Sequence, residues 1–130
     1  MKKLKPIALL TALAALALPL ASPVVAPAKD GDVRVSGKCT GSSSSKLKLG
    51  ARDGGIEAEF EVDQNVSGQT WRVKFKRGGK IIRRAKATTK APSGSFSLER
   101  RLPNRSGKDH VVGIAKNRAT GERCRAGATI

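Results

Sequence analysis

The chain has 130 residues, enough for one domain and little more, and it carries 26 Lys and Arg against 10 Asp and Glu, a net charge of +16. With one His and no Tyr, few side chains can transfer protons near neutral pH. Two Cys and one His cannot complete a four-ligand structural zinc site without carboxylates. We therefore expect a protein that is not an enzyme and that holds no metal or cofactor, with an apolar fraction of 38% that suffices for a small core.

The first 28 residues have the order of residues found in a secretory signal peptide. Three lysines precede an apolar run, Ile7–Leu18, which Pro19 ends, and small residues and prolines continue to Ala28. The run is about 12 residues long, short of the ~20 that span a bilayer, so a cleaved signal is favoured over an uncleaved membrane anchor. Cleavage is expected after Ala28, with Ala26 as the alternative, which leaves residues 29–130 as a single exported domain without a membrane span.

The two cysteines are expected to form a disulfide, because export leads to an oxidising compartment. Cys39 and Cys124 lie near the two ends of the exported domain, so their bond would close a loop of roughly 85 residues. Two free buried thiols are the alternative. A redox pair is disfavoured because the sequence has no C-x-x-C spacing.

Two segments alternate with the period of a half-buried strand. The segment 56–62 (IEAEFEV) places glutamates between apolar residues, and the segment 71–76 (WRVKFK) places Arg and Lys between apolar residues. Turn-forming residues at 63–68 separate them. We therefore predict that the two segments pair as a hairpin or as neighbouring strands, with acidic and basic outer faces matched.

Further alternating segments follow along the chain, separated by turn signals such as Gly78–Gly79. In the segment 81–84 (IIRR) either register points one arginine inward, and a β-bulge would resolve this conflict. These additional segments begin at Val33, Leu47, Ile81, Ser95, His110 and Cys124.

About seven or eight short strands predict an all-β fold, a small immunoglobulin-like antiparallel β-sandwich, with a small β-barrel as the alternative. Trp71 is expected in the core, on a central strand. The order Cys39, Trp71, Cys124 is loosely similar to that of an immunoglobulin domain, but here the cysteines lie on the first and last strands. The likeness is therefore one of architecture only.

Three constellations could suggest chemistry, and each has a simpler explanation. The segment 63–74 begins as a calcium-binding loop does, but Lys74 occupies the position that needs a bidentate carboxylate, so a turn is favoured. The glutamates of 56–62 could imitate a glycosidase pair, yet they are expected to face solvent beside basic partners. Asp109 and His110, with serines nearby in sequence, lack a Gly-x-Ser-x-Gly elbow. We expect no catalytic residue.

Basic residues crowd two parts of the chain, residues 74–90 and 100–108. A clustered positive field attracts polyanions. The aromatic side chains that nucleic-acid binding uses for stacking fall on predicted inner faces, so an anionic polymer of the cell envelope is a more plausible partner than nucleic acid. A solvated surface that only confers solubility is the alternative. The expected polyanion-binding residues are Arg72, Lys74, Lys76, Arg77, Lys80 and Arg84.

Four segments, GIEAEFEVD (55–63), GQTWRV (68–73), APSGSF (91–96) and ATGERC (119–124), together resemble a group of small secreted actinobacterial proteins of unknown function. The resemblance covers most of the exported domain. It implies a compact exported β domain with a Cys39–Cys124 pair, and it brings no catalytic residue and no ligand. The serine run just before Lys46 departs from the group, in which an aromatic often lies there.

These observations predict a secreted, non-enzymatic binding module at the cell surface or outside the cell, in contact with an anionic envelope polymer or another extracellular protein. The alternative is a secreted protease inhibitor, in which Arg83–Arg84 or Arg100–Arg101 in an exposed loop would enter a trypsin-like pocket. The single predicted disulfide is far from both arginine pairs, which disfavours this alternative, because inhibitor loops need to be held rigid.

Overall fold

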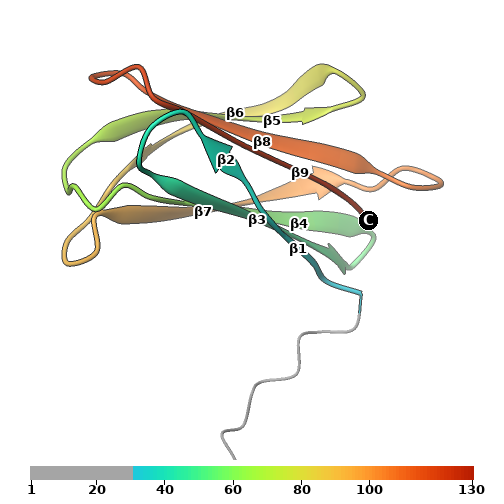
Figure 1. Cartoon of the computed structure of the whole chain (residues 1–130). Helices are drawn as coiled ribbons and strands as arrows, with labels where there is room; N and C mark the ends of the chain where they lie inside the picture. Colours follow the sequence, from blue (N-terminus) through green and yellow to red (C-terminus); the bar gives the residue numbers. More distant parts are fainter. Residues whose placement is uncertain (1–30) are drawn as a thin grey trace, which may run out of the picture.

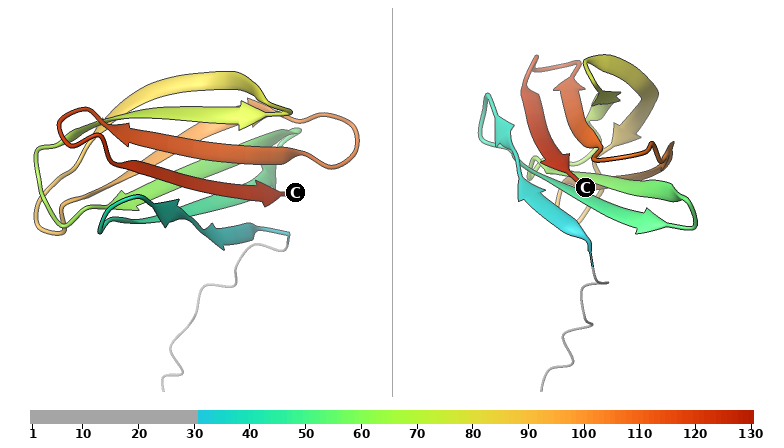
Figure 2. Two further views of the ribbon diagram at one scale, coloured as in Figure 1. Left: turned by 45° about the horizontal axis from the view of Figure 1, so that its top comes forward. Right: turned by 90° about the vertical axis from the view of Figure 1, so that its right-hand side faces the viewer.

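Residues 31–130 of the computed structural model form two antiparallel β-sheets packed face to face (Figures 1 and 2). The predicted signal peptide lies outside the described residues. One sheet has the strand order β1-β3-β4-β7, and the other has the order β2-β9-β8-β5-β6. Within residues 31–130 no helix has the length and hydropathy needed to cross a membrane. The strands are β1 (Val33–Ser36), β2 (Lys38–Cys39), β3 (Ser44–Arg52), β4 (Gly55–Asp63), β5 (Thr70–Arg77), β6 (Lys80–Thr88), β7 (Ser95–Pro103), β8 (His110–Asn117) and β9 (Arg123–Thr129).

The predicted β-sandwich is confirmed, and the barrel alternative is wrong because the two sheets stay separate. The first predicted strand is divided into β1 and β2 at Gly37, where the chain passes from one sheet to the other. The Gly37 N–H donates to the Ser45 carbonyl over 2.8 Å. A Cβ at this position would collide with the Ser45 side chain and with the Arg125 carbonyl, so glycine allows the crossing.

The predicted pairing of the acidic and basic segments is wrong, because β4 and β5 belong to different sheets. Strand β4 lies between β3 and β7, and two of its three glutamates, Glu59 and Glu61, lie opposite lysines of β3. The Lys48 ammonium is 3.4 Å from the Glu59 carboxylate. Opposite charges are therefore matched across strands as expected, but the partner is β3, and residues 64–69 cross between sheets instead of closing a hairpin.

The expected β-bulge is present in the β5–β6 hairpin. Phe75 lies opposite Arg83, whereas Lys76 lies opposite Ile81, so Ile82 is the extra residue. The bulge leaves both Arg83 and Arg84 exposed at the edge of the sheet.

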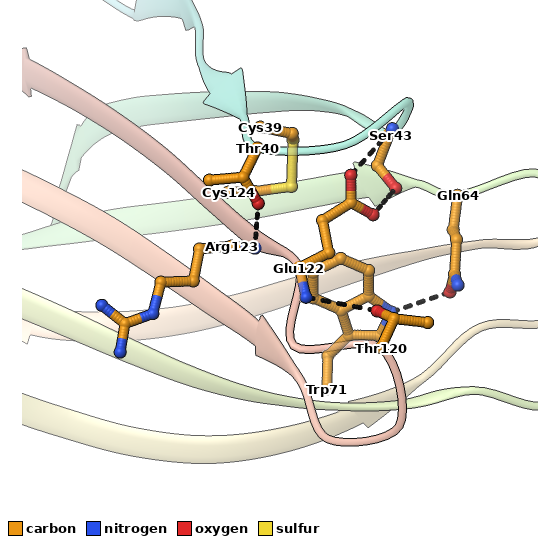
Figure 3. Close-up of a disulfide and its surroundings, with 9 residues drawn as sticks. All are labelled: Cys39, Thr40, Ser43, Gln64, Trp71, Thr120, Glu122, Arg123 and Cys124. Carbon is orange, nitrogen blue, oxygen red and sulfur yellow. Dashed lines mark hydrogen bonds between the residues drawn. A yellow bond between two sulfur atoms is a disulfide. The ribbon is translucent and has the colours of Figure 1, made fainter.

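Aromatic side chains fill the space between the sheets. Phe60 of β4 and Phe75 of β5 are fully buried and meet edge to face, with ring centroids 6.5 Å apart. Trp71 is also fully buried, as predicted, and its indole N–H donates to the Gln64 side-chain oxygen over 3.0 Å (Figure 3). The alternation of β5 therefore places its aromatic residues inside and its cations outside.

The Cys39–Cys124 disulfide is confirmed and joins directly opposite residues of β2 and β9 (Figure 3). It lies within one sheet, whereas the disulfide of antibody domains joins the two sheets, so the likeness to immunoglobulins is architectural. A disulfide is consistent with an oxidising environment.

Candidate functional site

The two sheets differ sharply in charge. The five strands of the β2-β9-β8-β5-β6 sheet carry twelve Lys and Arg residues and no Asp or Glu. The four strands of the other sheet carry six cations and five acids. One outer face of the sandwich is therefore cationic, and the other is mixed.

The strand register arranges the outward cations of the five-stranded sheet in two transverse rows. The four strands β6, β5, β8 and β9 lie side by side (Figure 2, left), and neighbouring strands are about 4.8 Å apart. The two rows are two residues apart along each strand, roughly 7 Å. The first row is Lys86, Arg72, Lys116 and Arg123, and the second is Arg84, Lys74, Ile114, Arg125 and Lys38.

A groove with a volume of about 640 Å³ runs over the first row and part of the second. The cations that line it come from four strands, β6, β5, β8 and β9. No short sequence motif contains this set of cations. Ile114 also lines the groove and is only partly buried. The groove is therefore walled by cations around an aliphatic side chain. Its charged lining residues are Arg72, Lys74, Lys76, Arg84, Lys86, Lys116 and Arg123.

No acid neutralises these cations within residues 31–130. The ion pairs of this part of the chain join Lys48 with Glu59, Arg52 with Asp32 and Arg77 with Asp109, and none uses a cation of the two rows. The field of the rows is therefore uncompensated and faces solvent.

Glu122, which precedes Arg123 in sequence, is turned away from the rows. Its carboxylate accepts hydrogen bonds from the Ser43 N–H, over 3.1 Å, and from the Ser43 hydroxyl. Figure 3 shows the Glu122 carboxylate aimed at Ser43 and the Arg123 guanidinium pointing the other way. Glu122 thus stabilises the loop before β3 through Ser43, and Arg123 has no carboxylate partner among the described residues.

The disulfide fixes the β2–β9 edge of the cationic face. Next to it, the Arg123 N–H donates to the Thr40 hydroxyl over 3.0 Å, and the Thr40 N–H donates to the Arg123 carbonyl over 2.8 Å. These contacts hold Lys38 opposite Arg125 at the end of the second row.

Four of the six residues expected to bind a polyanion line the groove: Arg72, Lys74, Lys76 and Arg84. Lys80 is exposed at the start of β6 but does not line it.

Arg77 lies elsewhere, and its assignment to the outer surface is wrong. Its side chain is buried, 3.5 Å from the Asp109 carboxylate, and donates to the Pro103 carbonyl. The reason is the strand alternation itself, because Arg77 is an even number of residues from Trp71 and so points inward.

Five further cations of the rows were not predicted from the sequence. They lie at outward positions of alternating strands, a signal that the sequence does contain. The β5–β6 hairpin brings Lys86 opposite Arg72. The gathering of the other four depends on β8 pairing with β5, and on β9 pairing with β8 and β2, which residue order alone does not determine. These cations are Lys38, Lys86, Lys116, Arg123 and Arg125.

The other constellations are not assembled for chemistry in the described residues. Asp109 binds Arg77 and the Arg105 N–H, whereas the His110 ring nitrogen is 2.8 Å from the Thr129 hydroxyl. The Asp63 carboxylate accepts the Asn65 N–H over 3.0 Å, which is the geometry of a turn. Within residues 31–130, no group of three or more His, Cys, Asp or Glu side chains is placed to hold a metal ion.

The two arginine pairs considered for protease inhibition lie in strands, not in loops. Arg83–Arg84 belongs to β6, and Arg100–Arg101 belongs to β7. The Arg101 guanidinium donates to the carbonyls of Arg52 and Asp53. Neither pair projects as a loop that a protease could engage.

Comparison with protein-family models finds no match, and no curated protein matches the chain significantly. The fold and the charge distribution define the class: a disulfide-bonded β-sandwich with one cationic and one charge-mixed face.

Proposed function

We propose that the protein is a secreted, non-enzymatic binding module whose cationic face contacts anionic polymers of the cell envelope. The observation that carries this proposal is the pair of transverse cation rows, which face solvent without an acid on any strand of their sheet. A polyanion that lies on such a surface releases its condensed counterions, and this supplies binding free energy.

The alignment of the cations argues against a role in solubility alone. Like charges directly opposite each other on neighbouring strands destabilise a sheet. Arg72 lies opposite both Lys86 and Lys116, and Lys116 lies opposite Arg123. Solubility requires net charge but no alignment, so scattered cations would serve it at lower cost to stability. Bound anions would relieve the repulsion.

Two further features support an extracellular polymer as the partner. The apolar N-terminal segment predicts export, and the disulfide suits an oxidising compartment. The aromatic side chains Phe60, Trp71, Phe75 and Phe96 are all buried, so the described residues offer no stacking platform for nucleic-acid bases.

The test is retention of the exported domain on purified cell wall across a salt series. Arg72→Gln with Lys74→Gln removes two cations of the groove, and Lys46→Gln with Lys48→Gln is the matched control, two cations spaced identically on the opposite face. We expect retention to fall steeply with salt, and the groove variant to reduce the slope of log affinity against log salt by about 1.4, at ~0.7 per lost contact. The control should bind like wild type. Absence of retention at low salt, or equal losses in both variants, would refute the proposal.

A further inference from the structure

One aliphatic side chain, Ile114, lines the groove among the cations. Ile114 occupies the outward position of β8 between Lys74 on β5 and Arg125 on β9. It lines the groove and is only partly buried. A ligand seated there meets cations on both sides of an aliphatic patch.

Each row contains four cations, whereas β5, which crosses both rows, supplies three outward cations along its length. Beyond Lys76 the last residue of β5 is the buried Arg77. Opposite Lys76 on β8 lies Val112, and opposite Val112 on β9 lies Gly127, so β8 and β9 add no cation beyond the two rows. Each row, in contrast, spans at least four strands, about 14 Å at ~4.8 Å per strand. A linear ligand meets most cations when it lies across β6, β5, β8 and β9, between the two rows.

We propose that the ligand is a linear polyanion in which anionic groups alternate with carbon segments, and that one carbon segment lies on Ile114. This inference rests on the proposed function. A polymer with contiguous charge, such as inorganic polyphosphate, satisfies the cations but places charged oxygens against Ile114, which leaves them without a hydrogen-bond donor. A carbon segment covers Ile114 and removes its apolar surface from water.

Two kinds of envelope polymer share this chemistry, phosphodiester-linked polyols and polymers of uronic acids. The experiment is isothermal titration calorimetry at fixed salt with poly(glycerol phosphate), polygalacturonate and inorganic polyphosphate, matched in number of charges. The proteins are wild type, Ile114→Ser, Arg72→Gln with Lys74→Gln, and Val66→Ser. Val66 is an exposed aliphatic residue outside the groove, so its variant is the matched control for Ile114→Ser. Thermal unfolding of each variant establishes that it is folded.

We expect Ile114→Ser to weaken binding of a carbon-containing polymer at least fourfold, the value of one buried methylene, and to leave polyphosphate binding unchanged. Val66→Ser should bind like wild type. Whichever of poly(glycerol phosphate) and polygalacturonate shows the Ile114 dependence identifies the source.

Equal weakening of all three polymers by Ile114→Ser, or weakening of none, overturns the inference. The proposed function still stands in that case if the Arg72 and Lys74 variant loses affinity. If wild-type protein binds none of the three polymers at low salt, the proposed function fails, and the inference fails with it.

Discussion

Asp109 and Arg77 form a buried ion pair whose disruption tests how the two sheets are joined at one end. The Arg77 side chain is 7% exposed and the Asp109 side chain 3%, and the guanidinium also donates to the Pro103 carbonyl of β7. The Asp109 carboxylate accepts the Arg105 N–H as well, over 3.3 Å. The pair therefore connects β5 of one sheet to the end of β7 in the other.

Asp109→Asn removes the only carboxylate paired with Arg77 in the described residues and leaves a buried guanidinium uncompensated. Breaking a buried ion pair in this way costs about 3–5 kcal/mol. A domain of this size has a free energy of unfolding of about 5–15 kcal/mol, so the variant should lose about a fifth of it or more. Arg77→Met combined with Asp109→Leu removes both charges, and we expect its stability to lie within about 1 kcal/mol of wild type or above it.

The assay is urea unfolding followed by the emission of Trp71, which is the only tryptophan and is fully buried in the folded domain. Glu99→Gln is the control, because it removes one charge from an exposed position of β7 and should change stability by less than about 0.5 kcal/mol. A loss below 1 kcal/mol in Asp109→Asn, or a double variant as unstable as the single one, would show that the pair is not a joint between the sheets.

Three further perturbations have outcomes that follow from the structure. Replacing Cys39 and Cys124 by Ser opens a loop of sequence separation 85 and should lower the free energy of unfolding by about 4–5 kcal/mol in urea titrations; an unchanged midpoint would contradict this. The hydrogen bond from Arg52 holds the pKa of Asp32 below its ordinary value. The stability that the ionised Asp32 contributes is therefore present above about pH 4 and is lost as the pH falls through the lowered pKa. Melting temperatures between pH 2 and 5 should therefore fall less steeply for Asp32→Asn than for wild type, and parallel curves would refute the linkage. Gly37→Ala should destabilise the domain by about 1–3 kcal/mol because the new methyl group meets a backbone carbonyl of β9 at 2.6 Å, and a neutral effect would mean that the crossing between sheets relaxes freely.

The strands themselves could be predicted from the sequence because each is amphipathic with a period of two. The segment 71–76 shows this most clearly, since its aromatic residues are buried and its cations are exposed or partly exposed in the structure, as expected. The sequence also indicated the bulge, because a regular register over residues 81–84 would point one of the two arginines inward. These are local properties, which the chain determines over a few residues.

The neighbours of each strand could not be predicted in the same way. Charge complementarity favoured pairing of 56–62 with 71–76, but Lys46 and Lys48 offered the glutamates an equally good set of partners on β3. Local charge matching cannot choose between two such partners, because each exposed pair contributes only tenths of a kcal/mol. The choice is made by the packing of the aromatic core between the sheets.

The same limit explains why only part of the candidate site was found from the sequence. Four cations of β5 and β6 that line the groove are close in sequence and were identified, whereas Lys116 and Arg123 join them only through the pairing of β8 with its two neighbours. Arg77 was included among the expected polyanion-binding residues as part of the basic cluster, although its position in the alternation pointed inward. A buried arginine requires a buried acid, and Asp109 is 32 residues away in sequence.

The disulfide and the cationic face are connected by the position of β2. This strand has two residues and pairs only with β9, and its Lys38 lies directly opposite Arg125, so the repulsion between these like charges opposes its place at the edge of the sheet. Two residues of backbone pairing cannot offset that repulsion dependably, since short strands are weak on their own. Cys39 follows Lys38 and lies directly opposite Cys124, which precedes Arg125. The disulfide between the two cysteines holds β2 in place against this repulsion. The disulfide thereby secures the second cation row where it reaches a fifth strand, together with the hydrogen bonds between Thr40 and Arg123.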